Sequence, residues 1–241
     1  IGQVITFPYI IDANGNEDDA DDFAIIDIIG FNASQPVSTI QIGWGDGQEK
    51  IFAGAIESYD PAKWGRSFVM PVGANSGIKM FDETILMITA AEPDTKVLIN
   101  SNTGATFSTT IDTSQFTIID RVEDAIIIDP NTTITADKDI RVFAFTSDPE
   151  GEYQTRWFSV APERSWASAY FLPAVIGENT KLFVHNPSKT EALKIYLDDI
   201  LQEESISPSE LKSFEVNHPV IVTADREFQA VVMIDAGNDK N

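Results

Sequence analysis

The sequence has no cysteine and few basic residues. Without Cys there is no disulfide framework, zinc ribbon, thiolate nucleophile or iron–sulfur cluster. Its 241 residues include 16 Lys and Arg against 38 Asp and Glu, a net charge of −22. Such a surface repels phosphate and anionic lipid, so we expect neither nucleic-acid binding nor docking on a membrane. No run approaches 18 apolar residues, so we expect no membrane-spanning helix.

Catalytic motifs are also missing. The two histidines, His185 and His218, stand alone, and no Gly-x-Ser-x-Gly turn presents a serine nucleophile. No glycine-rich loop ends in Gly-Lys-Ser/Thr, which argues against a phosphate cradle. A carboxylate pair could serve glycoside hydrolysis, but 38 acids make close pairs common, and none can be singled out. We therefore expect a protein that is not an enzyme.

Alternating apolar segments with frequent turn residues dominate the chain. Short runs rich in β-branched and aromatic residues predict strands at 96–99, 140–145, 181–185 and 228–233. Ala192–Glu203 fits either a helix or a hairpin turning at Asp198-Asp199, and we favour the hairpin. The pattern predicts an all-β fold of two tandem antiparallel β-sandwich domains, or three, with very little helix.

Internal repeats support a tandem organisation. Residues 134–138 (ITADK) match residues 222–226 (VTADR), and each segment precedes an apolar strand and follows a Thr-Lys strand, at Thr95-Lys96 and Thr180-Lys181. These matches predict three β units, at 1–88, 89–165 and 166–241. The first unit carries an acidic insertion. Because units of this size are short, they can also pair into two sandwiches.

Residues 88–97 and 133–145 resemble a repeat of secreted bacterial and archaeal cell-surface proteins, which also occurs in IgG Fc-binding-type adhesive proteins. The resemblance covers about residues 85–235 and rests on strand–turn patterns. It implies a β-rich scaffold at the cell surface or outside the cell, and it carries over no catalytic residue. The start at Ile1, without Met, fits a processed exported protein or a trimmed chain.

The acidic N-terminal third contains a candidate calcium site. Oxygen-bearing side chains alternate at Asp12, Asn14, Asn16 and Asp18, with Asp19 next to them, which suits the hard oxygen ligands that Ca²⁺ prefers. Glu17 stands where an EF-hand needs glycine, so the alternatives are an irregular calcium site and a solvated acidic loop. The sequons at Asn32 and Asn131 are candidate glycosylation sites.

Two segments are candidate interfaces. The opening strand, with Val4, Ile5 and Phe7, alternates and could pair with a sheet edge of the next copy. Aromatic and basic side chains between residues 153 and 171 are typical interface anchors, and we name Arg156, Trp157, Arg164 and Trp166.

Together these features favour a structural subunit of an extracellular homopolymer, such as a surface layer, sheath or filament. The alternative is an extracellular adhesin-like module that binds glycans or proteins.

Overall fold

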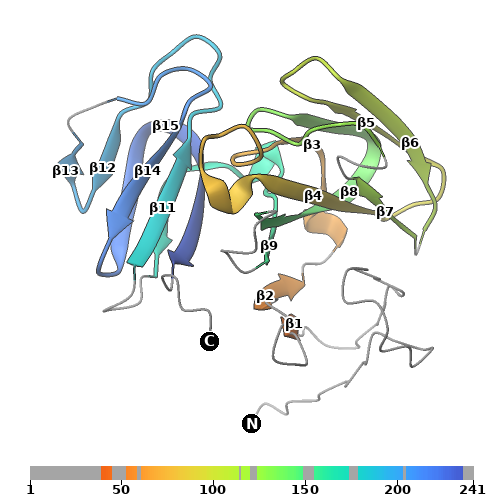
Figure 1. The fold of residues 1–241 in the computed structure, drawn as a ribbon, viewed down its shortest axis with the longest axis horizontal. Helices are drawn as coiled ribbons and strands as arrows, with labels where there is room; N and C mark the ends of the chain where they lie inside the picture. Colours follow the sequence, from red (N-terminus) through yellow and green to blue (C-terminus); the bar gives the residue numbers. More distant parts are fainter. Residues whose placement is uncertain are drawn as a thin grey trace.

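The computed structural model is an all-β protein, as the sequence predicts. It describes residues 39–44, 53–58, 61–113, 115–119, 124–148, 155–173, 179–202 and 205–235. All its sheets are antiparallel: one seven-stranded sheet that curls into a near-barrel, one six-stranded half-barrel, and the two-stranded ribbon β1 (Thr39–Trp44) and β2 (Ala53–Ser58) (Figure 1). In the described part of the chain, no helix has the length and apolar character needed to cross a membrane.

The near-barrel contains the strands from β3 to β9. They are β3 (Gly65–Val69), β4 (Glu83–Ala90), β5 (Thr95–Asn100), β6 (Thr106–Ile111), β7 (Phe116–Ile119), β8 (Thr133–Ser147) and β9 (Arg156–Ser159). The strand order is β6-β5-β8-β4-β7, with β3 and β9 also paired to β8.

The half-barrel repeats this arrangement. Its strands are β10 (Ala167–Leu172), β11 (Asn179–His185), β12 (Ile195–Leu197), β13 (Ile200–Leu201), β14 (Leu211–Val216) and β15 (Val220–Asp235). Every pairing from β10 to β15 has a counterpart in the same order from β3 to β8. We call β3–β9 the first repeat and β10–β15 the second.

One long strand organises each repeat. The first half of β8 pairs with β3 and β5, and its second half pairs with β4 and β9. In the same way, β15 pairs with β10 and β12 and then with β11. Because a single strand contributes to both halves of the sheet, it folds the sheet over one apolar core.

The match between residues 134–138 and residues 222–226 is confirmed at the level of hydrogen bonds. Asp137 accepts a bond from the backbone N–H of Lys96 at 2.8 Å, and Asp225 accepts one from Lys194 at 3.1 Å. Each aspartate therefore ties the long strand to the strand beside it. The predicted match of Lys96 with Lys181 is wrong, because Lys181 lies on β11, the counterpart of β4, whereas Lys194 holds the place of Lys96.

The hairpin predicted within Ala192–Glu203 is confirmed. β12 and β13 pair through Tyr196–Leu201 and Leu197–Ile200. Asp198 and Asp199 form the turn with φ angles of 48° and 65°, the left-handed values that a type I′ hairpin requires. The described part of the chain also contains short 3₁₀ turns: η1 (Pro61–Lys63), η2 (Lys79–Phe81) and η3 (Glu163–Ser165).

Each repeat has its own apolar core, and a third cluster joins the two. This joining cluster consists of Val72, Met80 and Phe81 from the first repeat and Phe183, Val231 and Met233 from the second. The rings of Phe81 and Phe183 meet edge to face, with centroids 5.0 Å apart. The boundary predicted between residues 88 and 89 falls inside β4, whereas residue 165 separates the two repeats.

We predict that Gly65→Ala destabilises the first repeat. An added Cβ at Gly65 would lie 2.3 Å from the Cβ of Pro162, whose rigid ring cannot move aside. Overpacking of this kind costs about 1–3 kcal/mol, measurable as a lower Tm by circular dichroism. The second repeat supplies the control, since Ala167 occupies the same register position there. Ala167→Gly should cost about 1 kcal/mol or less, and a Gly65→Ala protein as stable as the parent would contradict the prediction.

Candidate functional site

Four of the five exposed large hydrophobic side chains of the described residues lie on two equivalent surfaces. The five are Phe171 (70% exposed), Ile200 (68%), Ile221 (52%), Leu201 (51%) and Leu98 (40%). The first four lie on strands at the outer end of the second repeat, and Leu98 lies on β5 of the first. Clusters of exposed hydrophobic side chains are typical of surfaces that contact a partner.

The surface on the second repeat, which we call the apolar face, consists of Phe171, Tyr196, Leu201 and Ile221. Phe171 is directly opposite Ile221, and Tyr196 is directly opposite Leu201, so each pair points to one side of the sheet. Alternation along β15 puts Ile221 on the same side as Thr223, the partner of Tyr196. Ile200 is also exposed, but it is paired with Leu197 on the edge strand β13, so alternation puts it on the other side of the sheet from Leu201.

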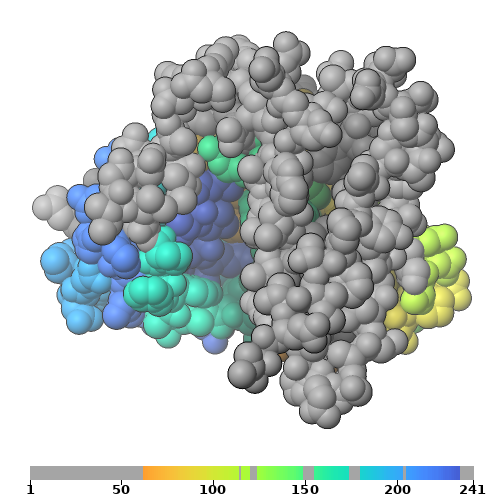
Figure 2. Space-filling model, turned by 90° about the horizontal axis from the view of Figure 1, so that it is seen from below, coloured from red at the N-terminus to blue at the C-terminus, as the bar shows by residue number. Residues whose placement is uncertain are grey.

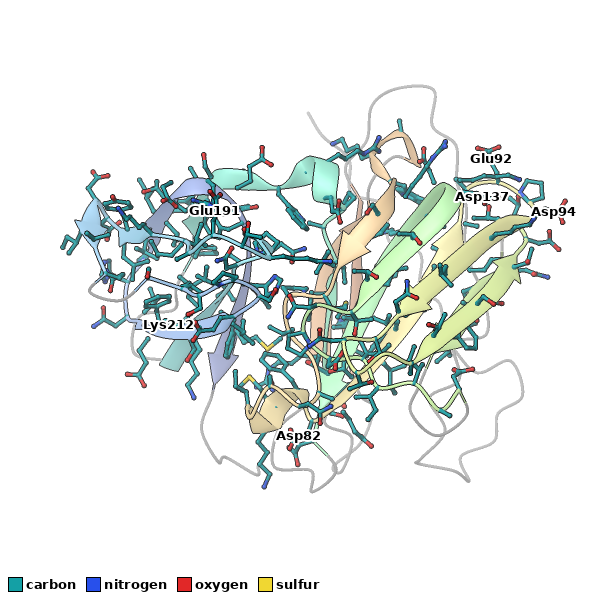
Figure 3. All side chains as sticks on the ribbon, turned by 90° about the horizontal axis from the view of Figure 1, so that it is seen from above. Asp82, Glu92, Asp94, Asp137, Glu191 and Lys212 are labelled. Carbon is teal, nitrogen blue, oxygen red and sulfur yellow. The ribbon has the colours of Figure 1, made fainter. Side chains whose placement is uncertain are left out.

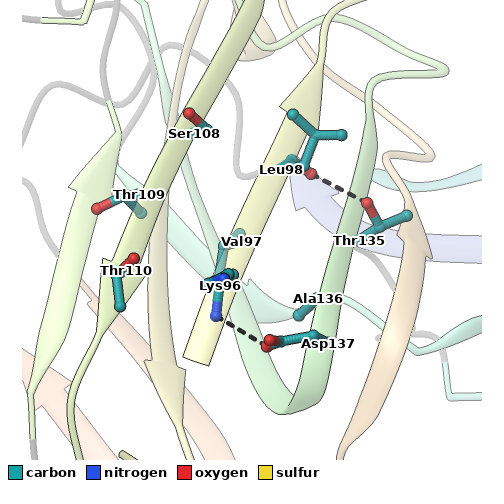
Figure 4. Close-up of a pocket in the computed structure, with 9 residues that line it drawn as sticks. All are labelled: Lys96, Val97, Leu98, Ser108, Thr109, Thr110, Thr135, Ala136 and Asp137. Carbon is teal, nitrogen blue, oxygen red and sulfur yellow. Dashed lines mark hydrogen bonds between the residues drawn. The ribbon is translucent and has the colours of Figure 1, made fainter. Parts of the chain in front are cut away.

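The same place on the first repeat is a depression. Its volume is about 530 Å³, and it is lined by residues 96–98 of β5, 108–110 of β6 and 135–137 of β8 (Figure 4). We call it the hollow. By register, Leu98 and Ser108 stand where the second repeat has Tyr196 and Leu201. Smaller side chains therefore occupy the hollow at positions where bulkier ones occupy the apolar face.

The positions next to these residues differ in the same way. Val69 and Thr133 stand opposite each other in the first repeat, at the places of Phe171 and Ile221 in the second. Both Val69 and Thr133 are half-buried. The two repeats thus share a sheet but differ in what its outer side presents.

The two surfaces lie at opposite ends of the molecule. Figure 1 shows β12 and β13 at one end of the long axis and β5 and β6 at the other. Seen from below, the blue atoms of the second repeat and the yellow-green atoms of the first repeat again occupy opposite sides (Figure 2).

Charges border both surfaces. Beside the apolar face, Asp198 accepts bonds from the backbone of Ile221 and from the ring of His218, both at 2.9 Å, and these bonds lower the pKa of Asp198. In the hollow, Lys96 is exposed, and Asp137 turns its carboxylate to the backbone of Lys96. Figure 3 shows Glu92 and Asp94 near Asp137, at the end of the first repeat.

A polar cluster lies between the repeats, and we call it the junction. Asn131 comes from the turn before β8, whereas His185 and Gln229 come from β11 and β15 and are 0% and 4% exposed. Nδ2 of Asn131 donates to the carbonyl of Ser209 at 2.9 Å, and Nε2 of Gln229 donates to the carbonyl of Val69 at 3.0 Å. Both bonds cross from one repeat to the other.

These two carbonyls fix which end of each amide faces His185. Oδ1 of Asn131 lies 2.9 Å from Nε2 of the ring, and Oε1 of Gln229 lies 3.3 Å from Nδ1. A neutral imidazole ring donates through only one nitrogen. If Nε2 carries the hydrogen, it donates to Asn131 in the shorter contact, and Nδ1 and Oε1 of Gln229 then face each other as two acceptors. Burial nevertheless lowers the pKa of His185 to about 4, because desolvation outweighs the contact with Gln229.

The structure places the sequence-predicted residues in different surroundings. Asn131 is in the junction, and its Nδ2, the atom that would carry a glycan, already donates to Ser209 between the repeats. A sugar there would push the repeats apart, so the geometry argues against glycosylation at Asn131. The remaining predicted residues of the N-terminal third lie outside the described residues: Val4, Ile5, Phe7, Asp12, Asn14, Asn16, Asp18, Asp19 and Asn32.

The predicted anchors between residues 153 and 171 do not form one exposed surface. Trp157 is 9% exposed and stacks on Phe145, with centroids 5.7 Å apart, inside a buried cluster. Arg156 is half-buried on β9, and Arg164 donates to the carbonyls of Ala62 and Trp64. Nε1 of Trp166 contacts the carbonyl of Ala161 at 3.4 Å. Arg164 thus joins η3 to the segment before β3, and Trp166 contacts the residues just before η3.

Sequence reasoning missed both the apolar face and the junction. His185 and Gln229 could have been found as isolated polar residues inside apolar strands, a pattern that indicates buried polar partners. No group of three or more His, Asp or Glu side chains that could hold a metal ion occurs among the described residues. The arrangement is suited to contact between surfaces.

We predict that His185 makes folding stability depend on pH. Its folded pKa of about 4 lies below the ordinary value near 6.5, so the unfolded chain binds more protons between these values. Stability is therefore complete above about pH 6.5 and falls as the pH drops toward 4, by about 2 kcal/mol between pH 7 and pH 5.

Chemical denaturation of the parent and of His185→Gln at both pH values measures this effect. The pH-dependent loss should be smaller in the variant by about 2 kcal/mol. The carboxylates titrate in both proteins, so their contribution cancels in the comparison. If the parent and His185→Gln lose the same stability between pH 7 and pH 5, the pKa of His185 is not lowered by folding, and the prediction is wrong.

Comparisons with protein-family models, with curated proteins and with solved structures found no match.

Proposed function

We propose that the chain is a structural subunit of an extracellular assembly that self-associates through the apolar face. The observation that carries the proposal is the exposure of Phe171, Ile200, Leu201 and Ile221 together at one end of a strongly acidic protein. Burying these side chains against a partner would remove apolar surface from water, which stabilises the contact by about 25 cal/mol per Å² of apolar area. A net charge of −22 otherwise keeps copies apart.

Other features agree with this role. The β-rich repeats match the scaffold that the resemblance to surface proteins implies, and β6 and β14 each pair on one side only. Unpaired strand edges are places where another strand adds. Pairing by the N-terminal strand and calcium binding in the acidic segment stay predictions, and assembly that survives a chelator unchanged would remove the calcium part.

Glycan or protein binding is the alternative function. It is favoured by one observation, the hydroxyl groups of Ser108, Thr109, Thr110 and Thr135 around the hollow. If the protein stays a monomer and binds immobilised polysaccharide, the alternative replaces the structural role.

We predict that Phe171→Ser combined with Ile221→Ser weakens self-association about 100-fold, because the apolar face loses two exposed hydrophobic side chains that lie opposite each other. Light scattering with size-exclusion chromatography, over a range of protein concentrations, measures the effect, and electron microscopy shows the assembled form. Both residues are more than half exposed, so the fold should remain intact.

The control is Glu215→Ser on β14, an exposed position outside the apolar face, which should associate like the parent. Circular dichroism checks that all three proteins are folded. A parent protein that stays monomeric at every concentration, with and without calcium, would refute the structural role.

A further inference from the structure

We propose that the apolar face of one copy docks into the hollow of the next copy, head to tail. The inference rests on the proposed function, because it names the partner surface for the same self-association. Four observations support it: the location of the exposed hydrophobics, the matching shape, the opposite ends and the charges.

Location narrows the choice of partner surface. Of the five exposed large hydrophobics among the described residues, three (Phe171, Leu201 and Ile221) belong to the apolar face, Leu98 belongs to the hollow, and Ile200 lies on the other side of the edge strand. Val97 and Ala136 also line the hollow, but their side chains pack against the core of the first repeat, so Leu98 is the exposed apolar contact that the hollow offers.

Shape follows from the internal repeat. At equivalent register positions the apolar face carries Leu201 and Phe171, where the first repeat carries Ser108 and Val69. The depression of about 530 Å³ is large enough for side chains such as Phe171 and Leu201. One repeat therefore has bulk at register positions where the other lacks it.

The two surfaces lie at opposite ends of the molecule, so the contact can continue from copy to copy (Figure 1). When the apolar face of one copy docks into the hollow of the next, the pair still has one free hollow at one end and one free apolar face at the other. A contact between two different surfaces that does not close into a ring generates a filament.

Charge favours this pairing over contact between two apolar faces. Asp198 and Asp199 form the β12–β13 turn that borders the apolar face, whereas the corresponding β5–β6 turn beside the hollow, at 101–105, has no charged residue. The hollow itself is lined by one cation, Lys96, and one anion, Asp137. Two apolar faces in contact would bring together two acidic turns, whereas an apolar face on the hollow brings in one, and we place Asp199 of this turn next to Lys96. Opposite charges at a contact fix the register and suppress the wrong pairing.

Complementation between two variants tests the inference. The face variant is Phe171→Ser with Ile221→Ser, and the hollow variant is Leu98→Glu with Ser108→Arg. Leu98 and Ser108 are directly opposite each other and exposed, so the new charged pair fills the hollow without changing net charge or the core. Each variant alone should associate about 100-fold more weakly than the parent. Mixed one to one, they should form a dimer of twice 26.5 kDa and nothing larger, since only one productive contact remains.

The possible outcomes separate the two proposals. If the hollow variant assembles like the parent while the face variant does not, the face docks elsewhere and this inference is overturned, although the structural role stands. If neither variant affects assembly, the inference is also overturned. If the parent itself stays monomeric, the proposed function fails.

A charge exchange provides an independent test. Lys96→Glu should weaken association of the parent, and adding Asp199→Lys to the same chain should restore most of it, because the pairing across copies is reversed. Lys63→Glu on η1 is the matched control, an exposed lysine outside both surfaces. Equal effects of Lys96→Glu and Lys63→Glu would show that only net charge matters and would overturn the assigned contact.

Discussion

The fold depends on one constraint, that a single long strand must serve two halves of a sheet. β8 meets four neighbours along its 15 residues, and β15 meets three along its 16. The register shift between the two halves of β8 lies opposite Gly65 and Ser67, and the matching shift in β15 lies opposite Ala167 and Ala169. Each long strand therefore bends at the same point, and its sheet folds over the core.

The aspartate at this bend explains why the strongest sequence repeat is found there. Asp137 and Asp225 hold the neighbouring strand through its backbone N–H, a role that an apolar side chain cannot fill. Residues 134–138 and 222–226 therefore kept a recognisable pattern, and the strands, the turns and the hairpin at Asp198 could be read from local alternation. Lys181 misled the comparison because a Thr-Lys pair at a strand start is common and carries no information about which strand it begins.

The candidate site could not be read from the sequence in the same way. Phe171 and Ile221 look like ordinary core residues of apolar strands, and only the register shows that they lie opposite each other on the outer side of the sheet. His185 and Asn131 are 54 residues apart and meet because the repeats fold against each other. Exposure and contact between repeats depend on tertiary packing, which periodicity within one strand does not contain.

The same sheets carry the junction, which holds the two repeats together, and the two outer surfaces, which are exposed. The filament that we propose, built from the apolar face and the hollow, would transmit force through both repeats, and this requires a fixed angle between them. The bonds of Asn131 and Gln229 to carbonyls of the opposite repeat, with the contact of Phe81 and Phe183, fix this angle.

A duplicated fold places equivalent surfaces on both repeats, and if these surfaces were identical, copies could pair in several ways. Differences at Leu98 and Tyr196, and at Ser108 and Leu201, remove this ambiguity: one end has bulk, the other has room, and only the hairpin turn beside the bulky end, Asp198-Asp199, is acidic, since the corresponding turn at 101–105 is not. In the assembly that we propose, direction follows from the divergence of two repeats within one chain.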